Sequence, residues 1–549
     1  MNYTIEKVTT LIGARRYGDT DANISFVLTD SRSLCFPEET LFFALKTERN
    51  DGHNYIPELY ARGVRNFVVE VVPDNWETLY SGSNFLKVVG SLEALQRLAE
   101  RHRDEFLIPI VGITGSNGKT MVKEWLYQLL SPQMVVTRSP RSYNSQIGVP
   151  LSVWLLNENT QVGVFEAGIS KPGEMMALRD IIQPTIGVFT SLGTAHQENF
   201  PSIEAKCMEK LCLFHDTKAI VYSMDDDILT HCLAQYNYQG EQLSWSIKHT
   251  DAAFYIKSIE KKDIETTITY TWKGGKEAQY KLPFIDDASV ENSITCAVVA
   301  LHLGVTQAAL AERMAQLEPV AMRLEVKEGQ HGCTLINDSY NSDYNSLDIA
   351  LDFMNRRPDH KGRKRTLILS DILQSGEEDK ELYNKVAFLC EKRGVNKFIG
   401  IGEGLLAERN AFKHLGEKHF FATINAFIHS EEFTNLHDEV ILLKGARQFG
   451  FDSLTELLVK KVHETVLEVN LNAVVDNLNW YRSFMKAETK LVCMIKADAY
   501  GAGAVEIAKT LQDHRVDYLA VAVADEGVTL RKNGITSNIM IMNPEMSSF

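Results

Sequence analysis

The sequence predicts an α/β protein made of several domains, most of which are built around a parallel sheet. Short apolar segments alternate with helix-compatible segments along most of the chain. This alternation is typical of parallel, doubly wound sheets. A chain of 549 residues is too long for a single hydrophobic core, so three or four domains are expected.

Four segments follow one another in this prediction, and each has its own strand pattern. Residues 1–105 alternate short strands with helical stretches such as Tyr55–Arg62. Strands are expected in residues 106–315 at Ile108–Ile113, Val162–Phe165, Ile186–Phe189 and Ala219–Tyr222. Residues 316–458 repeat the pattern as a smaller Rossmann-like sheet, at Thr334–Ile336, Thr366–Leu369, Lys397–Ile401 and Val440–Leu443.

Residues 465–549 follow a linker that begins at Lys460 and read as βα repeats of the barrel kind, that is, a partial TIM barrel. Their expected strands are Thr465–Leu471, Leu491–Ile495, Tyr518–Val523 and Asn538–Met542. Their expected helices are Ala473–Met485, Ala504–Leu511 and Glu526–Lys532.

Composition excludes some classes of partner. The net charge of −15 argues against binding to nucleic acid or to an anionic membrane surface. Residues 1–7 contain no apolar h-region, and no apolar run is long enough to span a bilayer, so neither a secretory signal nor membrane insertion is expected. The eight cysteines form no C-x-x-C pair, which favours reduced thiols and a cytoplasmic location.

The most informative stretch is residues 112–120, Gly-Ile-Thr-Gly-Ser-Asn-Gly-Lys-Thr, between an expected strand and an expected helix. Glycines let backbone N–H groups approach phosphates closely, and the helix N-terminus adds partial positive charge. Lys119 can reach the outer phosphates, and the Thr120 hydroxyl can bind Mg²⁺. The spacing departs from G-x-x-x-x-G-K-[ST], because Ile113 stands five residues before Gly118. The candidate phosphate-binding residues are Gly115, Ser116, Asn117, Gly118, Lys119 and Thr120.

Three further motifs follow this loop in order: Tyr143–Pro150, Phe165–Ser170 and Thr194–Phe200. Together with the loop they resemble the Mur ligase family and its relative folylpolyglutamate synthase, ATP-dependent ligases that join a carboxylate to an amine. The resemblance covers roughly residues 1–458. It implies a UDP-substrate domain over 1–105, a P-loop ATP-binding domain over 106–315 and a Rossmann-like ligase domain over 316–458.

The resemblance also implies a metal site. Thr120, Glu166 and His196 match the family's Mg²⁺ ligands, although Glu166 alone could be a strand terminator and a lone His is more often structural. Lys210 aligns, by a gapless count from His196, with the lysine that carries a carbamate in this family and becomes a further ligand. Lys206 is the competing candidate.

Other family positions imply contacts to nucleotide and substrate. Asn292 matches an adenine-contacting asparagine, although Ala288-Ser289 replace the usual His-Asn that opens that motif. Arg323 matches a phosphate-binding arginine and Asp338 a ribose-binding aspartate; both could instead be surface charges. The residues expected at the acyl substrate are Ser31, Arg32 and Asn144.

Two patterns indicate a branch of the family. Asp338-Ser339-Tyr340-Asn341 and Lys444-Gly445-Ala446-Arg447 resemble the ligases that add D-alanyl-D-alanine to UDP-N-acetylmuramoyl-tripeptide during peptidoglycan synthesis. The implied reaction passes through an acyl phosphate made from ATP. The alternatives left open are another Mur-type or folylpolyglutamate-like amide ligase, a P-loop ATPase and a nucleotide-binding module without catalysis.

The last segment carries a separate resemblance. Residues 490–501, Lys-Leu-Val-Cys-Met-Ile-Lys-Ala-Asp-Ala-Tyr-Gly, resemble the start of the alanine racemase family, in which a lysine matching Lys496 forms a Schiff base with pyridoxal phosphate. Racemases make D-alanine, a precursor of the dipeptide used above. Residues 465–549 are too few for that family's eight-unit barrel. We therefore expect pyridoxal phosphate to bind only in a complete racemase domain; whether the segment belongs to a longer fusion stays open.

Overall fold

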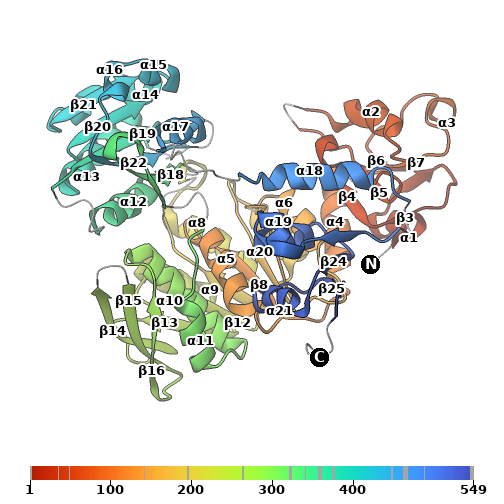
Figure 1. The fold of residues 1–549 in the computed structure, drawn as a ribbon, viewed down its shortest axis with the longest axis horizontal. Coiled ribbons are helices and arrows are strands. Elements are labelled where there is room, and N and C mark those ends of the chain that lie inside the picture. The colour runs from red at the N-terminus through yellow and green to blue at the C-terminus, as the bar shows by residue number, and fades with distance from the viewer. Residues whose placement is uncertain are drawn as a thin grey trace.

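The protein is a mixed α/β molecule whose sheets lie in successive parts of the chain (Figure 1). The computed structural model describes residues 3–34, 36–47, 50–140, 142–193, 197–262, 265–320, 324–339, 342–356, 362–373, 377–446, 449–460, 468–486 and 489–544. In these ranges, no helix combines the length and the apolar character needed to cross a membrane.

The first sheet has five strands in the order β2-β7-β6-β5-β4, parallel except for β2. Its strands are β2 (Arg15–Tyr17), β4 (Phe26–Leu28), β5 (Thr40–Phe43), β6 (Asn66–Val69) and β7 (Asn84–Lys87), beside the short pair β1 (Tyr3–Thr4) and β3 (Asn23–Ile24). The helices are α1 (Ile5–Ile12), α2 (Ile56–Ala61), α3 (Trp76–Leu79) and α4 (Ser91–Arg103). Thr4 caps α1 by accepting from the Lys7 amide, and Gly13 ends it with a φ of 66°.

The second sheet is the largest and has nine strands in the order β16-β15-β14-β13-β12-β11-β8-β10-β9. The strands are β8 (Ile110–Thr114), β9 (Val136–Arg138), β10 (Val162–Glu166), β11 (Ile186–Phe189), β12 (Ala219–Ser223), β13 (Glu241–Ser246), β14 (Phe254–Lys262), β15 (Glu265–Trp272) and β16 (Glu277–Leu282). The sequence predicted only parallel strands here, and the antiparallel edge β14-β15-β16 is a difference. Residues along β15 alternate between buried and half-buried, as expected for an antiparallel strand with one face on the core.

Helices flank this sheet, and α5 joins it directly to the glycine loop. They are α5 (Lys119–Leu130), α6 (Gly148–Val153), α7 (Glu174–Ile182), α8 (Ile203–Leu211), α9 (Asp227–Tyr236), α10 (Asp287–His302) and α11 (Gln307–Met314). α5 buries Val122, Trp125, Leu126, Leu129 and Leu130 in the core beside α10. Burying each such large side chain contributes about 1.5–3 kcal/mol, which holds the start of α5 firmly beneath the loop.

The third sheet has six strands in the order β17-β18-β22-β19-β20-β21, parallel except for β17. They are β17 (Glu325–Glu328), β18 (Thr334–Asp338), β19 (Lys364–Ser370), β20 (Lys397–Ile401), β21 (Glu417–Phe421) and β22 (Glu439–Lys444). Its helices are α12 (Tyr344–Arg356), α13 (Asp379–Lys392), α14 (Glu403–Ala407), α15 (Ile424–Ile428), α16 (Glu431–Thr434) and α17 (Phe451–Leu458).

The last part contains three parallel strands, β23 (Val492–Met494), β24 (Tyr518–Val521) and β25 (Asn538–Ile541). Its helices are α18 (Leu471–Arg482), α19 (Lys496–Gly501), α20 (Ala504–Asp513) and α21 (Ala524–Lys532). The strand expected over 465–471 is wrong where it can be checked, because Asn470 caps α18 and Leu471 is helical. Residues 461–467, including most of the expected linker, lie outside the described ranges.

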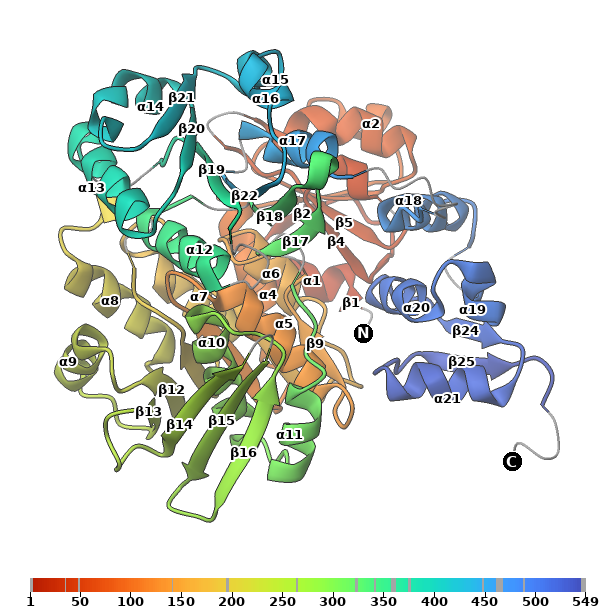
Figure 2. The ribbon, with the colours of Figure 1, turned by 60° about the vertical axis from the view of Figure 1, so that its left-hand side comes forward.

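This last part lies against the units of the first and second sheets rather than beside the third sheet, as the two views together show (Figures 1 and 2). The Arg515 guanidinium donates to the Trp154 carbonyl at 3.1 Å, and the Arg482 guanidinium lies 4.9 Å from the centre of the Phe36 ring. The last part of the chain therefore contacts the units of both the first and the second sheet.

Candidate nucleotide and metal site

A cavity of about 420 Å³ opens where the glycine loop meets α10 and the third sheet. Parallel α/β sheets bind ligands at the carboxyl ends of their strands, and the loop follows the end of β8 there. The lining includes Gly115, Ser116, Asn117, Gly118, Lys119, Thr120, Asn144, Lys210, Asn292, Asp338, Ser346 and Lys444. Residues distant in sequence and on two different sheets thus share one cavity.

The loop needs its glycines. Gly115 and Gly118 have φ values of 141° and 86°, which side-chain-bearing residues rarely adopt. A Cβ at Gly118 would also clash with the Asn292 side chain. The Lys119 ammonium donates to the carbonyls of Gly115 at 2.8 Å and Ser116 at 3.1 Å, so this cation lies across the loop.

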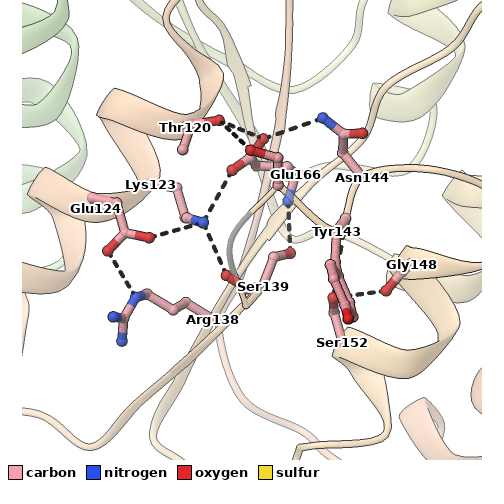
Figure 3. Close-up of polar contacts among 11 residues, drawn as sticks. Thr120, Lys123, Glu124, Arg138, Ser139, Tyr143, Asn144, Gly148, Ser152 and Glu166 are labelled. Carbon is pink, nitrogen blue, oxygen red and sulfur yellow. Dashed lines mark hydrogen bonds and ion pairs between the residues drawn. The ribbon is translucent and has the colours of Figure 1, made fainter. Parts of the chain in front are cut away.

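Glu166 ends β10 next to the loop because Glu166 pairs with Ile113 of β8. Its side chain is fully buried, and its Oε2 accepts hydrogen bonds from Thr120 Oγ1 at 3.1 Å and Asn144 Nδ2 at 3.4 Å (Figure 3). Carboxylate, hydroxyl and amide oxygens are the hard donors that Mg²⁺ prefers, so this group of side chains fits that ion. Asn144 was expected at the acyl substrate, and the structure places its side chain beside Glu166.

Sequence reasoning missed Lys123, which contacts Glu166 from the other side (Figure 3). Its ammonium lies 3.2 Å from Glu166 Oε1, a contact that is an ion pair rather than a well-aligned hydrogen bond, and neither side chain is exposed. The spacing could have revealed it, because residues three apart on a helix share a face and Thr120 precedes Lys123 by three.

Lys210 and Lys206 both point into the protein from α8. Lys210 Nζ donates to the Gly115 carbonyl at 3.1 Å and lines the cavity. Burial, reinforced by the positive charges of Lys119 and Lys206, holds the pKa of Lys210 well below its usual value. Lys206 donates to the Gly193 carbonyl, and burial lowers its pKa to about 8, against the opposing effect of Asp343. Burial therefore favours the neutral amine at both lysines, and Lys210 is the one that lines the cavity.

The third sheet contributes a buried ion pair to the cavity. Lys444 Nζ, at the end of β22, lies 2.7 Å from Asp338 Oδ2, at the end of β18, and both residues line the cavity. Asn292 lines it from α10. The expected residues His196, Arg323 and Arg447, and the pair Tyr340-Asn341, lie outside the described residues.

Two groups of expected residues do not line this cavity. Ser31 and Arg32 form a short 3₁₀ turn in the first unit, where the exposed Arg32 guanidinium lies 2.6 Å from Asp30 Oδ2. Lys496 begins α19 in the last unit.

The backbone that follows Lys496 is unusual. Ala497, Asp498, Ala499 and Tyr500 have φ values of 50–60°, so α19 contains a left-handed turn. Each such residue costs roughly 1–2 kcal/mol relative to the right-handed form. Hydrogen bonds offset part of this cost: the Ala497 amide donates to Glu526 Oε1 at 2.7 Å, and the Ala504 amide donates to Asp498 Oδ1 at 2.7 Å. Strained turns of this kind concentrate at functional sites.

A glycine loop that opens a helix at the end of a parallel strand, with a buried carboxylate beside its threonine, defines a P-loop-type nucleotide-binding protein. Three family models match the chain: the Mur ligase middle domain at residues 113–300, the Mur ligase family catalytic domain at 23–103 and the alanine racemase N-terminal domain at 469–548. Residues 23–103 and 113–300 therefore carry Mur ligase domains, and residues 469–548 carry a segment of the alanine racemase N-terminal domain.

Named relatives agree with this assignment. The chain is 26% identical to the UDP-N-acetylmuramoyl-tripeptide–D-alanyl-D-alanine ligase of Bacillus subtilis (strain 168), over 71% of this chain and 82% of that protein. It is 25% identical to the enzyme of that name from Escherichia coli (strain K12), over 83% of this chain and 98% of that protein.

Solved structures show the same fold. MurF from Acinetobacter baumannii matches with a TM-score of 0.73 at 21% identity, covering 83% of this chain and 99% of that one. The MurF ligase of Thermotoga maritima in complex with ADP matches with a TM-score of 0.66 at 23% identity, covering 78% and 96%. The expectation of a three-domain α/β ligase fold followed by a partial barrel is confirmed.

Proposed function

We propose that this chain uses ATP to join D-alanyl-D-alanine to UDP-N-acetylmuramoyl-tripeptide, a step of peptidoglycan precursor synthesis. The observation that carries the proposal is a single cavity lined by Lys119, Thr120 and Lys210 together with residues of the third sheet. The buried Glu166 accepts a hydrogen bond from Thr120 at the wall of this cavity. Relatives with the name of this enzyme, matched along most of their length, supply the substrates.

The loop and its lysine act on the phosphates of ATP. The substrate carboxylate attacks the γ-phosphorus, ADP leaves, and the acyl phosphate then reacts with the amine of the dipeptide to release phosphate. Loop N–H groups and the Lys119 ammonium stabilise the negative charge on the transferring phosphoryl oxygens. Thr120, Glu166 and the expected ligand His196 would hold Mg²⁺, which supplies further positive charge to those oxygens.

Lys210 has the chemistry needed to carry a carbamate. A neutral amine is the nucleophile toward CO₂: an N–C bond forms, one proton is released, and the side chain becomes an anion. The lowered pKa of Lys210 keeps this amine neutral, and its contact with the Gly115 carbonyl places it at the cavity. A carbamate at Lys210 would add an oxygen ligand for Mg²⁺.

The remaining site assignments belong to the same proposal. Asn292 contacts adenine, Asp338 the ribose, and Arg323 the phosphates, while Ser31 and Arg32 bind the UDP part of the acyl substrate. The domain boundaries at residues 105, 315 and 458 and the cytoplasmic location stay predictions.

One assay tests this function. Phosphate release is measured with ATP and Mg²⁺, with UDP-N-acetylmuramoyl-tripeptide and D-alanyl-D-alanine added singly and together. We expect release to require both, together with formation of the pentapeptide product. Release with ATP alone would indicate an ATPase instead, and turnover with a different amine would indicate another amide ligase.

A further inference from the structure

Lys123 and Glu166 form an ion pair, and both side chains are fully buried. A fully buried lysine is rare because removing an ammonium from water is costly unless every donor finds an acceptor. Lys123 has three partners. Its Nζ donates to the Ser139 carbonyl at 2.9 Å, lies 2.9 Å from Glu124 Oε1, and forms an ion pair with Glu166 Oε1 at 3.2 Å that is not a well-aligned hydrogen bond.

The residues around Lys123 are themselves held in place. Arg138 Nε lies 3.0 Å from Glu124 Oε2, and the Arg138 guanidinium stacks 3.6 Å from the centre of the Tyr127 ring. Ser139 also accepts a hydrogen bond from the Glu166 amide through its hydroxyl at 3.2 Å. The ammonium thus sits in a rigid set of charges that alternate in sign, from Arg138 through Glu124 and Lys123 to Glu166 (Figure 3).

This arrangement divides the two oxygens of Glu166 between two partners. Lys123 engages Oε1, and Oε2 is directed to Thr120 and Asn144 at the cavity. Thr120 and Lys123 lie three residues apart on α5, so one face of a single helix fixes both ends of the carboxylate. Without Lys123, the carboxylates of Glu166 and Glu124 would lose the cation that separates them.

We propose that Lys123 is a positioning residue that fixes the Glu166 carboxylate with Oε2 presented to the cation site and Oε1 withheld from it. This inference rests on the proposed role of Glu166 as a Mg²⁺ ligand. Lys123 contacts neither the nucleotide nor the reacting atoms in this scheme; it acts through Glu166.

The test begins with the protein free of nucleotide and metal. Denaturant unfolding is measured for the wild type, Lys123→Met, Glu166→Gln and the double variant. We expect Lys123→Met to raise the unfolding equilibrium constant roughly 100-fold, because it leaves a buried carboxylate unpaired. The double variant should be more stable than the sum of the single effects predicts, by about tenfold.

The second measurement is the Mg²⁺ dependence of ligation at saturating ATP. Lys123→Met should raise the half-saturating Mg²⁺ concentration about tenfold while the KM for D-alanyl-D-alanine stays unchanged. Lys123→Gln keeps a hydrogen-bond donor and should raise the half-saturating Mg²⁺ concentration less. If Lys123→Met folds poorly, the same measurement is made on Lys123→Gln. The control is Lys281→Met, which removes an exposed lysine paired with Glu265 on the same sheet and should change neither quantity.

Additive stabilities in the double variant would overturn the proposal, as would an unchanged Mg²⁺ curve in folded Lys123→Met. If Glu166→Gln keeps the wild-type Mg²⁺ curve, the metal role of Glu166 fails and the positioning role fails with it. This outcome can be distinguished from the absence of a Lys123–Glu166 interaction. The non-additive stability of the double variant, measured in the metal-free protein, would still reveal that interaction.

Discussion

Single residues at the phosphate loop are proposed to carry the chemistry, and Lys119 is the clearest example. Its ammonium donates hydrogen bonds to the carbonyls of Gly115 and Ser116, and Lys119 lines the cavity together with the loop. A cation preorganised in this position stabilises charge as the γ-phosphoryl group transfers, whereas a flexible surface lysine would first have to be ordered.

We expect Lys119→Ala to lower the ligation rate about 10²–10³-fold, since removing one preorganised electrostatic contact typically has an effect of this size. The rate is measured as product formation with both substrates, and thermal unfolding checks that the variant is folded. Lys276→Ala, on an exposed turn between β15 and β16, is the matched control. Near wild-type ligation by folded Lys119→Ala would contradict the assignment of the phosphate loop.

Lys210 and Lys206 differ in their expected contributions although both are buried on α8. Lys210→Ala should be inactive, because the anionic ligand formed from its neutral amine would be lost. A short carboxylate such as acetate should restore part of the turnover of this variant. Lys206→Ala should retain most activity and show no response to acetate.

Initial rates with and without the added carboxylate, at constant ionic strength, make this comparison. An active Lys210→Ala variant together with an inactive Lys206→Ala variant would exchange the two roles. Loss of the carbamate mass from intact protein in the Lys210 variant alone would provide an independent check.

At the scale of elements, the sequence predicted many helices and strands close to their observed ends. The helix expected directly after the glycine loop is α5, and the strand expected at Lys397–Ile401 is β20. These succeeded because apolar periodicity and flanking glycines are local signals. The antiparallel strands β14–β16 were missed, since partner choice within a sheet depends on residues far away in sequence.

The packing of α4 against α6 predicts a sensitivity to acid. His102 on α4 is buried, its Nδ1 is hydrogen-bonded to the Tyr3 hydroxyl at 2.9 Å and its Nε2 to the Leu156 carbonyl at 3.1 Å. Burial lowers the pKa of His102 to about 4, with Arg515 adding to the effect while the Leu156 carbonyl and Glu105 oppose it. The folded state therefore resists a proton that the unfolded chain takes up near pH 6.5.

Stability should consequently fall as pH drops from 6.5 to about 4, by up to about 3 kcal/mol from this one group. His102→Gln should be less stable than the wild type at pH 7 but should lose less stability across this window. Denaturant unfolding at several pH values measures both. His215→Gln, at an exposed site, should leave the pH profile unchanged; an identical slope in the His102 variant would refute the explanation.

At the scale of the whole molecule, two sheets close over one cavity and a third body packs alongside. The second and third sheets are linked through the cavity by residues such as Thr120 and Asp338. The racemase-like part contacts the ligase portion through Arg515 and Trp154. Closure of the third sheet over bound nucleotide would exclude water from the reactive acyl phosphate.

The purified 549-residue chain should neither bind pyridoxal phosphate stoichiometrically nor racemise alanine. Barrel sites are assembled from the loops after many strands, and the described residues contribute three strands around Lys496. The absorbance of protein-bound pyridoxal phosphate and the conversion of L-alanine to D-alanine are the measurements. The Lys496→Ala variant should give the same background as the wild type; a bound cofactor and racemisation that both depend on Lys496 would disprove the prediction.

The sequence by itself determined the phosphate loop, the order of the motifs and the α/β class. Each of these features depends on residues that are contiguous in the sequence. Glycines allow the loop, Lys119 and Thr120 follow it directly, and apolar runs indicate the strands. The racemase-like segment was also recognisable, because Lys496 lies within one continuous stretch. Family resemblance then linked these local signals to one class of ligase.

Only the tertiary structure decided which side chains meet. Glu166 and Lys123 are 43 positions apart and become an ion pair because β10 lies next to β8, which α5 follows. Asn144 reaches Glu166 because it follows β9, which pairs with β10. Lys210 reaches Gly115 because α8 follows β11, which pairs with β8. Sheet order, burial and the lowered pKa values of buried lysines depend on how distant segments pack, and no local pattern of residues encodes them.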